Sequence, residues 1–346
     1  MSRFIQLHVL TSYPPANLNR DDLGQPKTAR VGGVERLRIS SQSLKRAWRT
    51  SDVFVAALAE RIGTRTKRLG VEAFEALKNA GVAEKKAEEW AEKIAAVFGA
   101  AKKDKPLEIE QLVHVSPEER KRVDDLVARL AAENRAPKGE ELEALLSKQT
   151  AADIAMFGRM LANKPQHNVE AAVQVAHAIG VHASPVEDDY FTAVDDLNRD
   201  DESGAGHVGE AGFGAALFYE YVCIDREHLR ENLGDDEELT KRTLRALVEA
   251  VLKVAPVGKQ NSFASRAYAH FVLAEKGGQQ PRSLALAFLK PVDGADYAAD
   301  ATDALLRLRE NMEKVYGQCA DACMQMNVMT GEGSATALAD FVTGSE

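Results

Sequence analysis

Between Phe4 and Leu10 the chain alternates apolar and polar residues, as in Ile5-Gln6-Leu7-His8-Val9. Alternation with a period of two places the apolar side chains on one face of an extended strand and the polar side chains on the other. The pattern therefore predicts a half-buried β-strand near the start of the chain.

A loop, a short strand and a helix are expected next. Proline, asparagine and glycine accumulate between Ser12 and Gly33, which is typical of a loop. Residues 36–39 predict a short strand, and Ser40-Ser41 can cap a helix that begins near Gln42.

Residues 52–167 are rich in alanine, glutamate, lysine and leucine, and their apolar residues recur at helical spacing. Within this block, Ser116-Pro117-Glu118-Glu119 has the form of a capping box, with serine at the cap and glutamate at the third helical position. We therefore predict an inserted helical bundle over 52–167.

The period changes after this block. Larger residues alternate with smaller ones from Val173 to Val181, which favours a strand, although so short a run also fits a helix. Residues 183–214 are rich in glycine and aspartate, and they predict two extended arms around a tip near Ser203–Gly206.

The remaining sequence predicts three strands, two helices and a loose tail: strands over 217–224, 267–273 and 284–289, helices over 236–254 and 300–316, and the tail after Thr330. Without the two insertions, the order is β-α-β-β-α-β, the ferredoxin-like pattern that RNA-recognition modules also use. The predicted fold class is α/β, in the α+β sense.

Composition changes this picture little. The 346 residues are 45% hydrophobic and 28% charged, as in ordinary soluble globular proteins. No stretch approaches the length of a transmembrane helix, and the start does not resemble a signal peptide. The three cysteines form no CxxC pair, which favours a reducing compartment. We therefore expect a cytoplasmic protein and exclude the membrane-spanning and disulfide-rich classes.

Charge is segregated along the chain, whose formal net charge is −9. Residues 20–49 hold eight basic residues against three acidic ones, and 187–238 hold seventeen acidic residues against three arginines. Such separation predicts surfaces for different partners, or copies of the chain that meet each other, although solvated faces without partners also fit.

The basic segment has the arrangement of a phosphate site. Ser41, Lys45 and Arg49 are spaced four apart, so they share one face of the predicted helix. A capped helix start also offers free N–H groups to anions. An ordinary solvated helix face fits the spacing equally well, but Arg20, Lys27, Arg36 and Arg38 nearby favour phosphate binding.

Two further segments are weaker candidates. Lys259-Gln260-Asn261-Ser262-Phe263 is predicted to be a loop whose cation, amides and aromatic ring suit phosphate, base edge and base face. Gly158-Arg159-Met160 offers a cation and an apolar side chain, although a methionine is more often in the core.

Signals of catalysis are poor. Asp21-Asp22 and Asp195-Asp196 could in principle hold a metal ion, but adjacent carboxylates on a strand point to opposite faces. The eight histidines form no ligand-spaced cluster, and no hydrolase, metalloprotease or Walker motif occurs. We expect no catalytic residues, no metal site and no cofactor.

Several motifs together resemble one family. "FIQLHVL", "LNRDD", "RISSQSLKRAWR", "YFTAVDDL" and "ENLG" occur in order along most of the chain. They resemble the CasC family, the backbone subunit of the type I-E CRISPR Cascade complex. The resemblance is weakest over about 52–157.

The resemblance implies three structural parts: a ferredoxin-like or RRM-like palm (1–51, 168–182 and 215–346), helical fingers (52–167) and a hairpin-like thumb (183–214). It implies that Ser40, Gln42, Lys45, Arg46 and Arg49 grip phosphates of a CRISPR RNA guide, assisted by Arg20 and Lys27. Arg159 and Met160 would press on the guide, and Phe191, Thr192 and Val194 would form the thumb's wedge. The lysine-rich finger helix of the family is sparse here, near Arg135, Lys138 and Lys148.

The function implied is a non-catalytic scaffold for antiviral defence. Its partners would be CRISPR RNA, the target DNA strand, further copies in a helical and usually hexameric filament, and the large, small and guide-end-capping Cascade subunits. Two alternatives are an RNA-guided ribonuclease that uses Asp21 or Asp22, and a free-standing RNA-binding protein.

Overall fold

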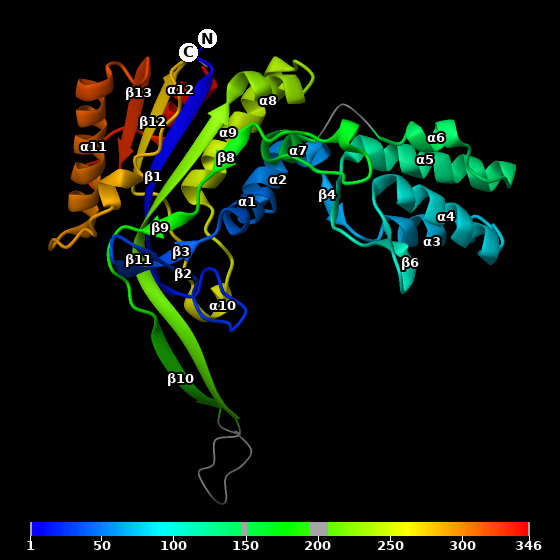
Figure 1. Ribbon diagram of the computed structural model, residues 1–346, viewed down its shortest axis with the longest axis horizontal. Coiled ribbons are helices and arrows are strands. Elements are labelled where there is room, and N and C mark those ends of the chain that lie inside the picture. The colour runs from blue at the N-terminus through cyan, green and yellow to red at the C-terminus, as the bar shows by residue number, and fades with distance from the viewer. Residues whose placement is uncertain (1, 147–150, 194–206, 345–346) are drawn as a thin grey trace, which may run out of the picture. The chain divides into compact units, whose positions relative to one another are not determined.

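The computed structural model describes residues 2–146, 151–193 and 207–344 (Figure 1). The chain divides into two compact units. The first unit comprises Met1–Val53, Val175–Ile224 and Leu244–Glu346, and the second comprises Phe54–Gln174 and Asp225–Thr243. The insertion expected at 52–167 lies almost wholly in the second unit, which also takes in Asp225–Thr243, a segment expected in the palm.

The first unit is built on one sheet. Its strands lie in the order β13 (Ala322–Asn327), β12 (Phe271–Gly277), β1 (Phe4–Ala16), β11 (His207–Asp225), β9 (Ala178–Gly180), β3 (Val34–Ile39) and β2 (Thr28–Val31). The short strand β8, Val173–Val175, and the strand β10, Glu187–Ala193, pair with β11 outside this path. The alternation from Val173 onward thus forms strand rather than helix.

Five helices and a 3₁₀ turn accompany the sheet: α1 (Ser41–Arg49), α9 (Glu237–Lys253), α10 (Gln260–Phe263), η3 (Ala285–Phe288), α11 (Tyr297–Tyr316) and α12 (Ala335–Thr343). Along the chain, β1, α1, β9, β11, α9 and β12 follow one another in the predicted β-α-β-β-α-β order. The mixed α/β fold class expected from the sequence is confirmed.

Both faces of the sheet are covered. On one face, α11 and η3 bury an apolar cluster that includes Leu10, Phe271 and Leu305. On the other, the ammonium of Lys276 on β12 lies 4.1 Å from the ring centre of Phe341 on α12. The prediction that β1 is half-buried is therefore wrong, because its polar face is also enclosed.

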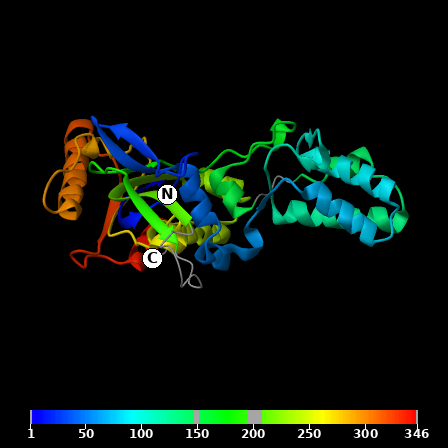
Figure 2. The ribbon, with the colours of Figure 1, turned by 90° about the horizontal axis from the view of Figure 1, so that it is seen from below.

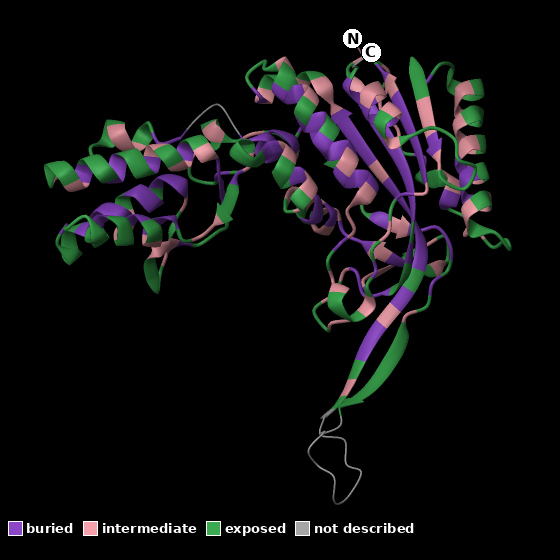
Figure 3. Cartoon of the chain, turned by 180° about the vertical axis from the view of Figure 1, so that it is seen from behind, coloured by how far each residue is buried: buried purple, intermediate pink, exposed green. Residues whose placement is uncertain are grey.

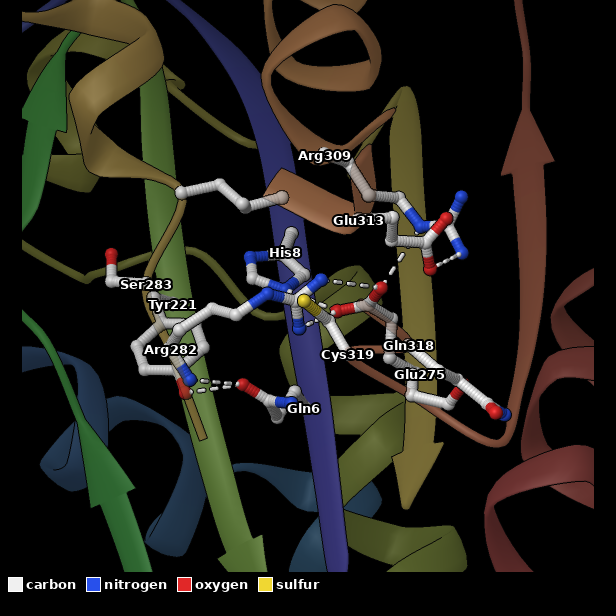
Figure 4. Close-up of polar contacts among 12 residues, drawn as sticks. Gln6, His8, Tyr221, Glu275, Arg282, Ser283, Arg309, Glu313, Gln318 and Cys319 are labelled. Atoms are coloured by element: carbon white, nitrogen blue, oxygen red, sulfur yellow. Dashed lines mark hydrogen bonds and ion pairs between the residues drawn. The ribbon is translucent and has the colours of Figure 1, made fainter. Parts of the chain in front are cut away.

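A buried polar cluster occupies that enclosed face of β1. The Glu275 carboxylate on β12 accepts hydrogen bonds from Arg282, at 2.7 and 3.1 Å, and from Arg309 Nε on α11, at 2.9 Å. His8 Nε2 lies 3.3 Å from the same carboxylate, and His8 Nδ1 lies 2.9 Å from the Tyr219 hydroxyl. Figure 4 shows both arginines and His8 converging on Glu275.

The contacts of this cluster set its charges. Burial raises the pKa of the Glu275 carboxyl, but hydrogen bonds from His8 and Arg282 outweigh burial and hold the pKa at about 2. Burial lowers the pKa of His8, so the imidazole is neutral and donates from Nε2 to the carboxylate. Arg282, Arg309 and His8 all engage the Glu275 carboxylate, and we interpret the cluster as structural.

An arm extends from the sheet. Strand β10 pairs antiparallel with the first half of β11, from Glu187 opposite Phe213 to Ala193 opposite His207. Every residue of β10 is exposed, whereas β11 becomes buried where it enters the sheet (Figure 3). These strands are the extended arms expected in 183–214, and their connection, 194–206, lies outside the described residues.

The second unit is mainly helical. Its helices are α2 (Asp52–Leu58), η1 (Ala59–Arg61), α3 (Leu69–Asn79), α4 (Glu84–Phe98), α5 (Pro117–Glu133), α6 (Gly139–Glu143), α7 (Ala152–Phe157), η2 (Pro165–His167) and α8 (Arg226–Asn232). Helices α3, α4 and α5 lie alongside one another around an apolar core (Figure 2). Two small two-stranded sheets pair β4 (Thr64–Thr66) with β7 (Val113–Val115), and β5 (Ala101–Lys102) with β6 (Lys105–Ile109).

Helix α5 begins as its sequence predicts. The Ser116 hydroxyl accepts from the Glu119 N–H at 3.2 Å, and the Glu119 carboxylate accepts from the Ser116 N–H at 3.0 Å. The predicted capping box is therefore confirmed.

Two predictions about the C-terminal third are wrong. The strand expected at 284–289 is the 3₁₀ turn η3, because the guanidinium of Arg36 binds the carbonyls of Phe288 and Leu289 in place of a neighbouring strand. The tail expected to be loose contains α12, whose Leu338 and Val342 are fully buried one helical turn apart. Strand β13 had no clear sequence signal.

Glu220 on β11 is buried without a cation beside it. The residue is 7% exposed, and within the described part of the chain its Oε1 has no hydrogen-bond partner. Burial raises its pKa to about 8, so the carboxyl is protonated at neutral pH.

We expect the stability of the first unit to fall as the pH rises from about 4.3, the value for an unfolded glutamate, to about 8. In this window the unfolded chain has released a proton that folded Glu220 keeps. Glu220→Gln should remove this dependence of stability on pH, and above about pH 8 the variant should have a higher melting temperature than the wild type. Melting temperatures from about pH 5 to about pH 9 measure it. Glu310→Gln on the exposed side of α11 is the control, and a Glu220→Gln curve parallel to the wild type would contradict the prediction.

Candidate nucleic-acid interface

Helix α1 presents a row of polar and basic side chains. Leu44, Ala47 and Trp48 form its buried stripe. Its first turn holds no acidic residue and its last turn holds two arginines. Four of the remaining positions are what we call its cationic face: Gln42, Lys45, Arg46 and Arg49. Gln42 and Arg46 are exposed, and Lys45 and Arg49 are half-buried.

The start of α1 differs from the prediction. Ser40 is the N-cap residue, but its hydroxyl makes no capping hydrogen bond. Its N–H instead donates to Oδ1 of Asn19 at 2.8 Å, which ties the helix to the preceding loop. Ser40 is 1% exposed, so the expectation that it grips a phosphate is wrong for its side chain.

The loop before β2 and the cationic face enclose a hollow of about 470 Å³. Its lining includes Arg20, Asp21 and Asp22 of the loop, Ser43 and Arg46 of α1, and Thr50 just after the helix. Val257 and Gly258 also line it. The fold thus brings Arg20 and Arg46, which are 26 positions apart in the sequence, to one concave surface.

The same loop is fastened to the foot of the arm. Asn17, which is fully buried, donates from Nδ2 to the carbonyls of Gly24, at 2.9 Å, and of Gly212 on β11, at 2.8 Å. Sequence reasoning missed Asn17, because an asparagine in a loop carries no signal of its distant partner.

The basic residues around β2 and β3 differ in how far they are buried. Arg36 is fully buried and donates to Gly180, Phe288 and Leu289 carbonyls, so it serves the fold and not the basic surface. Lys27 is half-buried, and its carbonyl accepts from the Arg38 N–H at 2.8 Å.

The segment from Lys259 to Phe263 is helical rather than a loop. Gln260–Phe263 form the short helix α10 after Lys259, whose φ of 44° is left-handed. Asn261 is exposed, and Lys259 and Gln260 are half-buried. The Phe263 ring lies 6.1 Å from that of Phe213 at the foot of the arm, so packing against Phe213 occupies part of its surface.

Arg159 and Met160 belong to the second unit and have opposite environments. Arg159 is 6% exposed and donates to the Glu119 carboxylate at 2.6 Å and the His114 carbonyl at 3.1 Å. The expectation that Arg159 presses on a guide is therefore wrong, because this buried ion pair holds it. Met160 is 77% exposed, which excludes the alternative of a core methionine.

On the arm, Phe191 and Thr192 are exposed on β10, and Val194 lies outside the described residues. Phe191 is directly opposite Gly209 on β11. A Cβ atom at Gly209 would lie 2.4 Å from Cζ of Phe191, so the ring lies over the bare backbone of the glycine. This places an aromatic ring on one face of the arm.

Asp21 has a structural role in its loop. Its Oδ1 accepts the N–H groups of Leu23 and Gln25, both at 2.9 Å, an Asx-turn arrangement. Asp22 is exposed beside it. Over the described ranges, no group of three or more histidine, cysteine, aspartate or glutamate side chains is arranged to hold a metal ion.

No helix among the described residues has both the length and the apolar character needed to cross a membrane.

Known proteins resemble this chain over nearly its whole length. A family model described as CT1975-like protein matches residues 5–342. A solved chain titled "CRISPR RNA-guided surveillance complex, pre-nicking" is 30% identical, with a TM-score of 0.84 over 99% of both chains. Another, titled "CRISPR RNA-guided surveillance complex", is 25% identical, with a TM-score of 0.62 over 99% of this chain and 100% of that one. No curated protein sequence matches.

Proposed function

The chain belongs to the CT1975-like protein family, and on that premise we propose that it is an RNA-binding scaffold subunit of a CRISPR RNA-guided surveillance complex. Its partners are the guide RNA and other subunits of the complex. The finer type I-E assignment from the sequence motifs remains a prediction.

The observation that carries the proposal is a difference in how cations are paired. On the second unit, Arg120, Arg122 and Arg135 each form an ion pair with a glutamate. Arg20 and Arg46, which line the hollow, and Lys27, on the segment that leads from it into β2, have no carboxylate partner among the described residues. Cations that the protein leaves unneutralised suit the phosphates of a nucleic acid, whose affinity grows with each phosphate neutralised.

Single-stranded guide RNA fits the surface better than a duplex. The cationic face and the hollow lie in the same unit as an arm that carries an exposed aromatic ring. Sequence-tolerant binding of single strands combines a basic groove with apolar or aromatic side chains that contact bases. We propose that the first unit holds the guide backbone and that the arm displaces bases at intervals.

Several copies would stack along one guide, leaving the bases between arms open to the target DNA strand. The fingers contribute less to DNA binding than the family pattern implies. Arg135 donates two hydrogen bonds to Glu141, at 2.8 and 2.9 Å, and Lys148 lies outside the described residues. Arg135 is therefore held within the protein.

The test is to purify the tagged protein from its host and to sequence the RNA that accompanies it. RNA derived from CRISPR repeats is expected, together with a large particle in size-exclusion chromatography that requires the guide. Absence of RNA from a folded preparation would refute the proposal, and unrelated RNA on a monomer would favour a free-standing RNA-binding protein.

We propose that the subunit does not cleave RNA. The hydrogen bonds to Asp21 Oδ1 favour a loop-shaping role for that carboxylate over metal binding. Complementary RNA, incubated with the assembled complex and magnesium, should remain intact. Cuts at regular spacing that disappear in Asp22→Asn would establish the ribonuclease alternative.

Replacing Phe191 with alanine is expected to abolish periodic base displacement while leaving the protein folded. Holding a base out of its stack costs a few kcal/mol, which the apolar ring offsets. The fold should tolerate the change, since the residue opposite Phe191 is a glycine on the arm itself. Chemical probing of guide bases in the assembled complex measures displacement.

Tyr190→Ala is the matched control, because Tyr190 is the neighbouring aromatic, 68% exposed, on the opposite face of β10. Periodic reactive bases should persist in that variant. If they also persist in Phe191→Ala, and its melting temperature falls, the ring is structural and the wedge assignment is wrong.

A further inference from the structure

Lys27, Arg38 and His177 share one face of the sheet. The register of β2 and β3 places Thr28 opposite Leu37, and the Arg38 N–H donates to the Lys27 carbonyl at 2.8 Å, so Lys27 lies opposite Arg38. On its other side, Arg38 lies opposite Ile179 of β9. His177 is two residues before Ile179, and residues two apart on an extended chain face the same way.

The contact between Arg38 and His177 determines the tautomer of the imidazole. Arg38 Nη1 lies 2.9 Å from His177 Nδ1. A guanidinium can only donate, so Nδ1 accepts and the ring proton is on Nε2. His177 is exposed, and its Nε2–H is therefore a donor available at the surface.

The surroundings keep His177 uncharged. Partial burial, followed by the charges of Arg38 on β3, Lys27 before β2 and Lys45 on α1, lowers its pKa. Protonation would also place an N–H group against the donating guanidinium of Arg38.

Lys27 and Arg38 repel each other across the hairpin. Like charges directly opposite on neighbouring strands destabilise a sheet. Neither side chain forms an ion pair with a carboxylate in the described part of the chain; the Arg38 guanidinium donates to the Thr28 carbonyl, at 3.4 Å, and to His177. An anion bound between them would relieve the repulsion.

We propose that Lys27, Arg38 and His177 form one site for a phosphodiester of the guide, in which the two cations neutralise the phosphate and neutral His177 donates from Nε2. The inference rests on the proposed guide binding. It assigns binding roles to Arg38 and His177, and it divides the site into charged and uncharged contacts.

Charged and uncharged contacts differ in their dependence on salt. A cation that neutralises a phosphate releases counterions, so Lys27→Ala should weaken guide binding and reduce the log–log salt slope by about 0.7. His177→Ala should weaken binding by about tenfold at every salt concentration, with the slope unchanged. His177→Asn, which keeps an acceptor for Arg38 and a donor, should restore most of the affinity.

The experiment measures guide affinity from low to high salt for the assembled protein, with melting temperatures to show that each variant is folded. Wild-type protein that fails to bind guide refutes the proposed function. If wild type binds and His177→Ala binds equally well, only this inference fails. A reduced salt slope in His177→Ala would show that the histidine is charged. A loss of affinity that vanishes on a 2′-deoxy guide would show a contact with the sugar, and a loss that varies with base composition would show a contact with a base. Any of these results overturns the phosphate assignment.

Discussion

Glu275→Gln is expected to lower the free energy of unfolding of the first unit by about 3–5 kcal/mol, the range for breaking a buried ion pair from one side. Glutamine keeps the shape of the side chain but removes the charge on which Arg282 and Arg309 converge. Both arginines and His8 would then face an amide that cannot accept all their hydrogen bonds. Denaturant unfolding at neutral pH, followed by a probe in the first unit, measures the loss.

The pH dependence gives an independent check. Because the folded pKa of Glu275, about 2, lies below the unfolded value of about 4.3, its stabilisation is present above the unfolded value and is lost as the pH falls toward the folded value. Glu275→Gln should lack this acid-side decline. Glu249→Gln breaks an exposed pair with Lys253 on α9 and is the control. Equal losses in the two variants would show that the buried cluster does not stabilise the sheet.

The double variant Lys45→Ala, Arg49→Ala is expected to weaken guide RNA binding by about 100-fold. Each hydrogen bond to a charged partner contributes about 1.5 kcal/mol, and two such losses correspond to that factor. The log–log salt slope should fall by about 1.4, twice the value of about 0.7 for one phosphate on a single strand. The loss should be the same for guides of different sequence, since phosphates carry no sequence information.

A matched control separates local contact from overall charge. Lys290→Ala with Lys314→Ala removes the same charge from the first unit at positions away from α1, and it should leave the slope within error of the wild type. Trp48 lies between the two altered positions and is buried, so a folded circular-dichroism spectrum is required first. An unchanged slope in the α1 variant would remove these two residues from the phosphate contacts.

Most elements could be predicted because their signals are local. The period-two alternation around Leu7 and the capping box at Ser116 each specify a structure within a few residues. The stripe of Leu44, Ala47 and Trp48 likewise determined which face of α1 remains cationic. The order of β1, α1, β9, β11, α9 and β12, and the motifs that resemble the CasC family, followed from the sequence by itself.

Tertiary structure alone decided which basic residues form the surface. Arg36 and Arg38 are two apart on one strand and look equivalent in sequence. Arg36, however, is fully buried and donates to the carbonyls of Phe288 and Leu289, whereas Arg38 donates to His177. Arg159 matched a binding motif but is held by Glu119, 40 residues away. Burial of a charge depends on partners that arrive from distant segments, and no local pattern encodes them.

The same reason explains what the sequence could not show about β1 and the proposed phosphate site. The polar face of β1 is enclosed because Glu275 and Tyr219 contact its histidine from neighbouring strands, and Arg282 and Arg309 in turn donate to Glu275. Lys27 and His177 are 150 positions apart and become neighbours only through the register of β3 with β2 and β9. Periodicity determines which way a side chain faces along its own strand, and strand pairing determines which side chain lies beside it.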